Sequence, residues 1–515
     1  MMRPAGKNAG ATLAVDPQPT FDLSPYLFMQ FMEPLGIADG SVEAAWDFLH
    51  DRWREDLIKV TRELAPTLIR WPGGCFASYY RWKEGVGPRS RRKPMLNLCW
   101  GGTETNQVGT HEYIDFCRAV GADSLTVVNF ESDGRKQWAH PPKGGVRSGS
   151  PREAAEWVDY CNNPRNPLRR RHGAREPFGV RLWQIGNETS YDPHGYDCET
   201  AARRTVAFAR AMRSADPDIE LIGWGDSGWA RRMLEVAGEH LQYLAFHHGI
   251  RSTLPDSPLQ WDEYRKDPAR TWEHLMSAWR STEAKLSAMR EQVAGGPPAR
   301  RGRPVKLALT ESHFSAPGRH RSEVLSTWGA GVAYARVLNV YIRNGDLLKI
   351  ATMADFCGTS WMTNAVMIPR GGAYMMPVAR VMALARRHIG TKALAVLASP
   401  PNLDVTASRK GKRIYLHAVN TSRTEPVEAH LAVQGMSITS GRAFQIADDP
   451  MRQIDQRTRD LFSPTEHQLP VPASRDSTGA PWTFPPASVT AVELEVTSLG
   501  SLGGSRLRES VGAGL

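Results

Sequence analysis

The sequence of 515 residues predicts a (β/α)₈ barrel with a C-terminal antiparallel β-sandwich, and three observations support this prediction. Over residues 21–388, short apolar runs alternate regularly with amphipathic helical segments, as in a chain of βα units. After about residue 390 the pattern changes to short alternating runs separated by Pro, Asn, Asp and Ser. No glycine-rich nucleotide loop follows the first apolar run, which disfavours a doubly wound sheet.

Eight apolar runs are candidate barrel strands because each has the length of a buried strand and is followed by polar or turn residues. They are YLFMQFM (26–32), PTLIRW (66–71), SLTVVNF (124–130), GVRLWQIG (179–186), IELIGW (219–224), YLAFHH (243–248), VKLALT (305–310) and LLKIATM (347–353).

The segments between these runs have helical periodicity. In HEYIDFCRAVG (111–121), Tyr113, Phe116 and Val120 fall on one face, and Gly121 is a candidate C-cap. The pattern also predicts helices over 151–162, where Pro151 suits a first turn, and over 199–216.

The last part of the chain predicts a sandwich through the runs KALAVLA, RIYLHAVN, EAHLAVQG and SVTAVELEV. The early segment ATLAVDPQ (11–18) is also strand-like, and we expect it to pair into the same sandwich. The predicted domains are therefore an N-terminal segment (1–20), a barrel (21–388), a sandwich (389–497) and a disordered tail (498–515).

The formal net charge of +10 is concentrated in PRSRRKP (88–94), PLRRRH (167–172) and PPARRGRP (297–304). Each run lies among prolines and glycines in a predicted loop, so solvated surface is the favoured interpretation. No recognition helix or aromatic-interleaved pattern accompanies them, which argues against a nucleic-acid partner. Attraction of an acidic polymer is the weaker alternative.

The six cysteines are scattered, without a CxxC pair or zinc-ligand spacing, so we expect reduced thiols, no metal and no disulfide framework. The N-terminus lacks the apolar core of a signal peptide, and no segment approaches the roughly 20 apolar residues of a membrane span. We therefore expect a cytoplasmic protein without membrane association.

Two glutamates occupy matching places on the predicted barrel. Glu188 stands two residues beyond the apolar part of the fourth strand, and Glu311 directly follows the seventh. Barrel enzymes place their chemistry at the C-terminal ends of strands, and a pair of carboxylates at one mouth is what glycoside hydrolysis requires. Either glutamate alone would be interpreted as a surface carboxylate. The pair, with Asn187 available to hold a sugar hydroxyl, favours the catalytic interpretation.

A family resemblance rests on six stretches, of which WPGG-x-F combined with a later GNE is the most specific. They are MQFMEPLG (29–36), IRWPGGCFASYYRWKEGVGPR (69–89), ETNQVGTHEYIDFC (104–117), EWVDYCN (156–162), WQIGNE (183–188) and LALTES (307–312). Together they span most of residues 26–365. In these stretches the chain resembles glycoside hydrolase family 51, the α-L-arabinofuranosidase family within the clan of (β/α)₈ retaining glycosidases.

The resemblance implies exo-hydrolysis of terminal α-L-arabinofuranosides by double displacement, with a carbohydrate substrate, no cofactor and a homo-oligomeric assembly. Glu188 corresponds to the acid/base and Glu311 to the nucleophile. Asn187 corresponds to the residue on the sugar 2-hydroxyl, and Glu33 and Cys75 to residues that line the pocket. For such a retaining pair we expect carboxyl groups about 5–5.5 Å apart.

Further substrate-binding candidates have alternative structural interpretations. Arg70 ends the second strand, and the Gly-Gly turn after it lets Cys75 approach the barrel mouth, although Cys75 alone would be interpreted as a buried thiol. Glu33 is placed either to bind sugar hydroxyls or to cap the helix near SVEAAWDF. Trp100 offers an apolar face to a sugar, as do Trp82 and Trp183, whereas core packing is the usual role of tryptophan.

The chain departs from the family pattern at three places in the sugar pocket. His247-His248 replaces a His-Tyr pair, ESHFS ending at Ser315 lacks a Trp, and the segment around Trp361 lacks a Gln. His248 is a candidate to hydrogen-bond the nucleophile or the sugar as the Tyr would, or is a core histidine. Neighbouring strand residues point to opposite faces, so we do not expect His247, His248 and His313 to share a metal.

Other functions stay open from the sequence. A related retaining enzyme, a β-xylosidase or an endo-glucanase, would use the same two carboxylates. A non-catalytic carbohydrate-binding protein is disfavoured because both glutamates are present. A polyanion-binding role for the basic loops is the remaining alternative.

Overall fold

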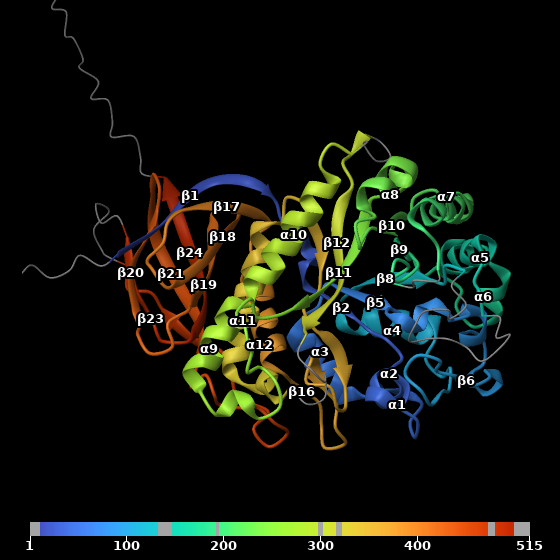
Figure 1. Ribbon diagram of the computed structural model, residues 1–515, viewed down its shortest axis with the longest axis horizontal. Helices are drawn as coiled ribbons and strands as arrows, with labels where there is room; N and C mark the ends of the chain where they lie inside the picture. The colour runs from blue at the N-terminus through green and yellow to red at the C-terminus, as the bar shows by residue number, and fades with distance from the viewer. Residues whose placement is uncertain are drawn as a thin grey trace, which may run out of the picture.

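The computed structural model describes residues 11–131, 147–191, 195–296, 302–315, 322–471 and 479–498. A barrel and a sandwich lie side by side, with the sandwich on the left of Figure 1 and the barrel on the right. Residues 499–515 of the predicted tail and residues 297–301 of the third basic run lie outside the described residues.

Within the described ranges, the barrel has eight neighbouring parallel strands in chain order, as predicted. They are β2 (Met29–Phe31), β5 (Leu68–Trp71), β8 (Asp123–Val128), β9 (Leu182–Ile185), β10 (Glu220–Trp224), β11 (Tyr243–Ile250), β12 (Lys306–Phe314) and β13 (Leu348–Ala351). β14 (Asp355–Gly358) adds to β2 and leads through β15 (Asn364–Met367) to the antiparallel β16 (Tyr374–Met375).

Helices follow the strands and cover the outside of the barrel. The longer ones are α3 (Glu55–Leu64), α4 (Thr110–Val120), α5 (Pro151–Asn162), α7 (Cys198–Ala215), α8 (Ala230–Ala237), α9 (Pro268–Ser277), α10 (Trp279–Val293), α11 (Trp328–Arg343) and α12 (Pro377–Arg387). Short helical turns include α1 (Gly36–Asp39), α2 (Ser41–Ala45), α6 (Pro167–Arg171), η1 (Pro25–Phe28) and η2 (Cys75–Ser78). In the part of the chain that the structure covers, no helix is both long and apolar enough to cross a membrane.

The three helices predicted from periodicity form within one residue of their expected bounds, because the capping residues are present. α4 ends at Gly121, whose left-handed φ of 74° a glycine adopts without strain. α5 begins after Ser150, which accepts a hydrogen bond from the Glu153 amide, and α7 is capped in the same way by Asp197.

The interior of the barrel is filled by a packed apolar core. One layer takes a buried side chain from every barrel strand: Met29, Leu68, Leu125, Leu182, Ile222, Ala245, Ala308 and Ile350, with Trp224 beside them. Most of these residues lie in the first half of their strands, so the layer supports the polar side chains at the strand ends.

The sandwich is formed by strands from both ends of the chain and has its own apolar core. Its strands are β1 (Ala11–Asp22), β17 (Lys392–Ala398), β18 (Leu403–Lys410), β19 (Arg413–Asn420), β20 (Val427–Val433), β21 (Met436–Ala447), β22 (Thr465–Gln468), β23 (Ala480–Phe484) and β24 (Ser488–Ser498). β1 lies between β17 and β20, and its pairing with β20 is parallel, so the sandwich is antiparallel apart from this pair. The domain bounds drawn from the sequence stay predictions.

Helix α11 packs against the strands of the sandwich, and Figure 1 shows it between the barrel and the sandwich together with α12. Asp404 of β18 is the centre of this junction. Its carboxylate accepts from Arg336 at 3.1 Å and from Arg343 at 2.6 Å, and its carbonyl accepts from Asn339 at 3.1 Å. Because Arg336 is largely buried, it depends on this carboxylate for its counter-charge.

We expect Asp404→Ala to lower the free energy of unfolding by about 3 kcal/mol, because it leaves a buried guanidinium without its partner. Chemical denaturation followed by tryptophan fluorescence measures this loss. Glu466→Ala, which removes an exposed ion pair with Arg442, is the matched control and should cost about 1 kcal/mol or less. Equal losses in the two variants would show that the Asp404 cluster does not hold the junction.

Candidate active site

Arg70, at the end of β5, is the central cation of the barrel mouth. Its side chain is 0% exposed. It donates to Gln184 Oε1 at 2.9 Å, to Asn187 Oδ1 at 2.5 Å and to Glu311 Oε1 at 2.9 Å. One guanidinium on β5 therefore fixes side chains from or beside two other strands, β9 and β12.

Glu188 follows β9 through a left-handed turn. Gly186 has φ 75° and Glu188 itself has φ 51°, a value that costs a non-glycine residue some backbone strain. Its carboxylate is contacted by His247 Nδ1 at 2.9 Å from Oε1, and the Cys75 thiol donates to Oε2 at 3.6 Å. The turn thus directs a largely buried carboxylate into the mouth.

Glu311 lies within β12 and not after it, because β12 continues to Phe314, four residues beyond the predicted strand end. The register between β11 and β12 shifts between Phe246 and His247, so His247 pairs with Glu311. His247 Nδ1 is 3.7 Å from Glu311 Oε2, and its Nε2 is 3.0 Å from Thr310 Oγ1.

The two carboxylates therefore share one imidazole nitrogen. A Glu188 oxygen, a His247 nitrogen and a Glu311 oxygen lie within 4.8 Å of one another. So short a distance between the Glu188 and Glu311 oxygens fits a retaining pair, because inverting enzymes need carboxyl groups about 6.5–9.5 Å apart to admit a water. Among the described residues, this is the single cluster of His, Cys, Asp and Glu with the spacing of metal ligands. Arg70 already supplies a positive charge to Glu311 there.

Glu33 lies after β2 and faces the loop that follows β5. Its Oε1 accepts from the Phe76 amide at 2.9 Å and from Trp100 Nε1 at 2.8 Å. A Cβ at Gly74 would lie 2.0 Å from Glu33 Oε2, so only glycine permits this approach. The alternative of a helix cap is wrong, because α2 has Gly40 as its N-cap residue.

The three tryptophans considered for sugar contacts divide into two groups. Trp82 and Trp183 are buried and pack against Trp157, at ring-centroid distances of 5.9 and 5.7 Å, so they belong to the core. Trp100 is half-buried, bonds to Glu33, and meets Trp361 edge to face at 5.3 Å. Trp100 and Trp361 are therefore the pair placed beside the pocket.

The prediction that His248 contacts the nucleophile or the sugar is wrong. Its Nε2 is 3.3 Å from Ser281 Oγ on α10, outside the barrel, and burial lowers its pKa to about 4. Successive strand residues face opposite sides, so His247 points inward and His248 outward. The sequence identified the His-His pair but not which of the two side chains points into the barrel. That orientation depends on the register shift before His247, which leaves no signal in the sequence. His313 Nδ1 lies 3.6 Å from Asp355 Oδ1.

Asp226, which the sequence analysis did not single out, holds the backbone of His247 in place. Its carboxylate accepts from the His247 amide at 3.2 Å and from the Tyr191 hydroxyl at 2.8 Å, and it forms an ion pair with Lys285. Burial alone would raise the pKa of Asp226, but Lys285 and these donors hold it below its usual value. An ionised Asp226 anchors the irregular segment of β11 that carries His247.

Comparisons with known proteins find relatives in sequence and in fold. The family model for the alpha-L-arabinofuranosidase 1 domain matches residues 60–266. An intracellular exo-alpha-(1->5)-L-arabinofuranosidase of Streptomyces lividans is 25% identical over 91% of this chain and 72% of its own length. A probable alpha-L-arabinofuranosidase C of Aspergillus niger is 32% identical over 65% of this chain and 66% of its own. The structure of an alpha-L-arabinofuranosidase from Thermotoga maritima superposes with a TM-score of 0.75 at 22% identity, covering 94% and 99% of the two chains.

The surroundings of the cysteines predict an order of thiol reactivity. Burial, together with Cys99 and the Glu188 and Glu33 charges, raises the pKa of Cys75, and burial does the same for Cys117, Cys161 and Cys357. Since the thiolate is the nucleophile, we expect iodoacetamide to label half-buried Cys99 more than about tenfold faster than Cys75. Peptide mass spectrometry after timed labelling measures the rates, and concentrated guanidinium chloride should equalise them. Faster labelling of Cys75 in the native protein would contradict the buried, protonated thiol.

Proposed function

The chain belongs to glycoside hydrolase family 51, the α-L-arabinofuranosidases, and we propose that it is a retaining exo-glycosidase acting on terminal α-L-arabinofuranosyl residues. The observation that carries the proposal is the pair Glu188 and Glu311, held within 4.8 Å around one imidazole nitrogen at the barrel mouth. Its substrates are arabinose-containing oligo- or polysaccharides, and the chemistry needs two carboxylates and water.

Glu311 is the nucleophile in this mechanism. Arg70 holds Oε1 and places a positive charge beside it, which orients the carboxylate and leaves Oε2 on the side of His247. Attack on the anomeric carbon forms a covalent glycosyl-enzyme and expels the leaving group.

Glu188 is the acid/base. Its two oxygens contact a thiol and an imidazole, neither of which is a fixed cation like Arg70, so this carboxylate is the one suited to carry a proton. It protonates the leaving oxygen in the first step and takes a proton from water in the second. Asn187 Oδ1 faces Arg70, which turns the amide nitrogen toward the position of a sugar hydroxyl.

Glu33, Cys75 and Trp100 form the binding pocket for the terminal sugar. Glu33 is fixed by the Phe76 amide and the Trp100 indole, and a fixed carboxylate is a strong acceptor for sugar hydroxyls. Such a cluster at one end of the site favours removal of single terminal residues over cleavage within a chain.

The partner implied by this function is a carbohydrate. The Streptomyces lividans relative is named an intracellular enzyme, which supports the cytoplasmic location expected from the sequence. A homo-oligomer stays a prediction from the family resemblance.

A panel of aryl glycosides tests the activity. We expect efficient release of phenol from an aryl α-L-arabinofuranoside and at least about a hundredfold lower kcat/KM on aryl β-xylosides and β-glucosides, because the pocket must fit the sugar in the transition state. Preference for a xyloside or a glucan would replace the arabinofuranoside assignment. No turnover on any glycoside would support a non-catalytic carbohydrate-binding protein.

Azide rescue distinguishes the roles of the two glutamates. Glu188→Ala should still form the covalent intermediate from an aryl glycoside with an acidic phenol, and azide should then give a glycosyl azide of retained configuration. Glu311→Ala should lose about ten-thousand-fold in kcat, and azide should attack the substrate directly to give the inverted product. Proton NMR of the anomeric position distinguishes the two products.

The exposed Glu291→Ala is the matched control and should keep full activity. Identical azide stereochemistry from the two variants would refute the assigned roles. The assigned roles would also be refuted if Glu188→Ala lost activity equally on substrates with good and poor leaving groups and azide did not restore it.

A further inference from the structure

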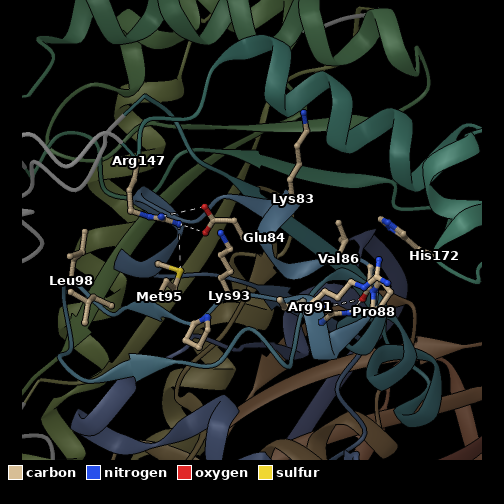
Figure 2. Close-up of a pocket in the computed structure, with 14 residues that line it drawn as sticks. Lys83, Glu84, Val86, Pro88, Arg91, Lys93, Met95, Leu98, Arg147 and His172 are labelled. Carbon is tan, nitrogen blue, oxygen red and sulfur yellow. Dashed lines mark hydrogen bonds and ion pairs between the residues drawn. The ribbon is translucent and has the colours of Figure 1, made fainter.

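A second cavity lies in the long loop that joins β5 to α4, separate from the two glutamates. Its volume is about 770 Å³, within the roughly 300–1,000 Å³ typical of small-molecule sites. Residues 83–98 supply most of its lining, and Arg147 and His172 complete it (Figure 2). We name it the basic cavity.

The lining of the basic cavity is strongly positive. Among the described residues that line it there is one carboxylate, Glu84, and there are five Lys or Arg side chains: Lys83, Arg91, Arg92, Lys93 and Arg147. Figure 2 shows Glu84 between Lys93 and Arg147, and Arg147 forms the ion pair at 2.6 Å. The cavity therefore keeps a net positive charge, and an anion is the complementary ligand.

Some of these cations are already neutralised and some are not. Arg92 forms a bidentate pair with Glu112 at 2.9 and 3.0 Å, and Lys83 pairs with Glu156. Across the residues described, no carboxylate pairs with Arg91 or Lys93. These two exposed side chains are the ones available to a ligand.

The tertiary structure brings two basic runs together here. Arg91 and Lys93 come from the run 88–94, and His172 comes from the run 167–172. A Cβ at Gly87 would lie 3.1 Å from His172 Nε2, so the two segments are in close contact. Burial lowers the pKa of His172, which makes its neutral imidazole a hydrogen-bonding group in the wall. The two runs therefore share one wall, while Arg91, Lys93, Arg170 and Arg171 within them stay exposed, as expected for solvated surface.

The basic cavity adjoins the sugar pocket through a shared wall. Arg147 Nε donates to the Tyr79 carbonyl at 2.9 Å, and the Tyr79 hydroxyl donates to Asn97 at 2.7 Å. Leu98 lines the cavity, and two residues later Trp100 donates to Glu33 in the pocket. A ligand held here would be connected to the mouth of the barrel along one continuous loop.

Apart from His172, the remaining described residues of the lining are aliphatic. Val86, Met95 and Leu98 are among them, and the described residues that line the cavity include no Phe, Tyr or Trp. Nucleic-acid sites use aromatic rings to stack bases, and the described part of the lining offers none. Aliphatic walls with cations suit the C–H faces and carboxylate of an acidic sugar.

We propose that the basic cavity binds a uronic acid unit of the substrate, in the part of the saccharide beyond the arabinofuranosyl residue that is released. This inference rests on the proposed function, because it assigns the aglycone side of the same active site. The uronate carboxylate binds between Arg91 and Lys93, and the enzyme thereby prefers arabinofuranosides carried on acidic saccharides.

Calorimetry with trigalacturonate tests binding directly. We expect the double variant Arg91→Gln, Lys93→Gln to raise Kd about fivefold or more, because two charge contacts are lost. Lys410→Gln, Lys412→Gln removes two exposed charges from the sandwich and should leave Kd unchanged. Methyl-esterified trigalacturonate, which keeps the sugars but not the charges, should not bind.

Activity gives the second readout. Both double variants should hydrolyse a neutral aryl α-L-arabinofuranoside with wild-type kcat/KM, whereas only the cavity variant should lose a preference for uronate-containing arabinofuranosides. The inference is overturned if the wild type does not bind trigalacturonate or if the cavity variant binds it equally well. Tighter binding of an oligothymidylate of equal charge through Arg91 and Lys93 would also overturn it in favour of nucleic acid. Absence of aryl arabinofuranoside hydrolysis, with trigalacturonate binding intact, would instead refute the proposed function and leave the anion site standing.

Discussion

The buried guanidinium of Arg70 is the constraint on which the active site depends. A charge with no exposed surface costs several kcal/mol unless acceptors are held around it. Gln184, Asn187 and Glu311 are those acceptors, and they come from or follow strands β9 and β12. Because each acceptor must be in place for Arg70 to be buried, the orientation of the nucleophile candidate is coupled to the packing of the barrel itself.

The same constraint makes the two glutamates chemically different although they lie close together. Glu311 is bonded to a permanent cation, whereas Glu188 contacts a buried thiol and an imidazole. The left-handed conformation of Glu188 stores local strain that the surrounding contacts must offset. Two carboxylates in unlike surroundings are the arrangement that lets one act as a nucleophile while the other transfers a proton.

The loop between β5 and α4 extends the active site outward. It begins with the Gly74 approach to Glu33, forms the wall of the basic cavity over residues 83–98, and carries Cys75 and Trp100, which we propose for the sugar pocket. The barrel supplies a rigid base through its apolar layer, and this loop supplies the contacts that vary with substrate. In the proposed function, recognition of the released sugar and of the rest of the saccharide thus depends on a single segment.

The sequence by itself determined the eight strands, the capped helices and the placement of Glu188 after the fourth strand, because these follow from local periodicity, capping chemistry and strand polarity. It also assigned Glu311 to the seventh strand, although β12 continues past Glu311 to Phe314. Only the tertiary structure decided that His247 and not His248 faces the carboxylates, because this depends on a register shift between β11 and β12. It also decided that Glu33 bonds to Trp100, that β1 runs parallel to β20, and that two basic runs meet in one cavity. Each of these is a contact between segments far apart in the chain, and no local pattern encodes which distant partner a side chain or strand will meet.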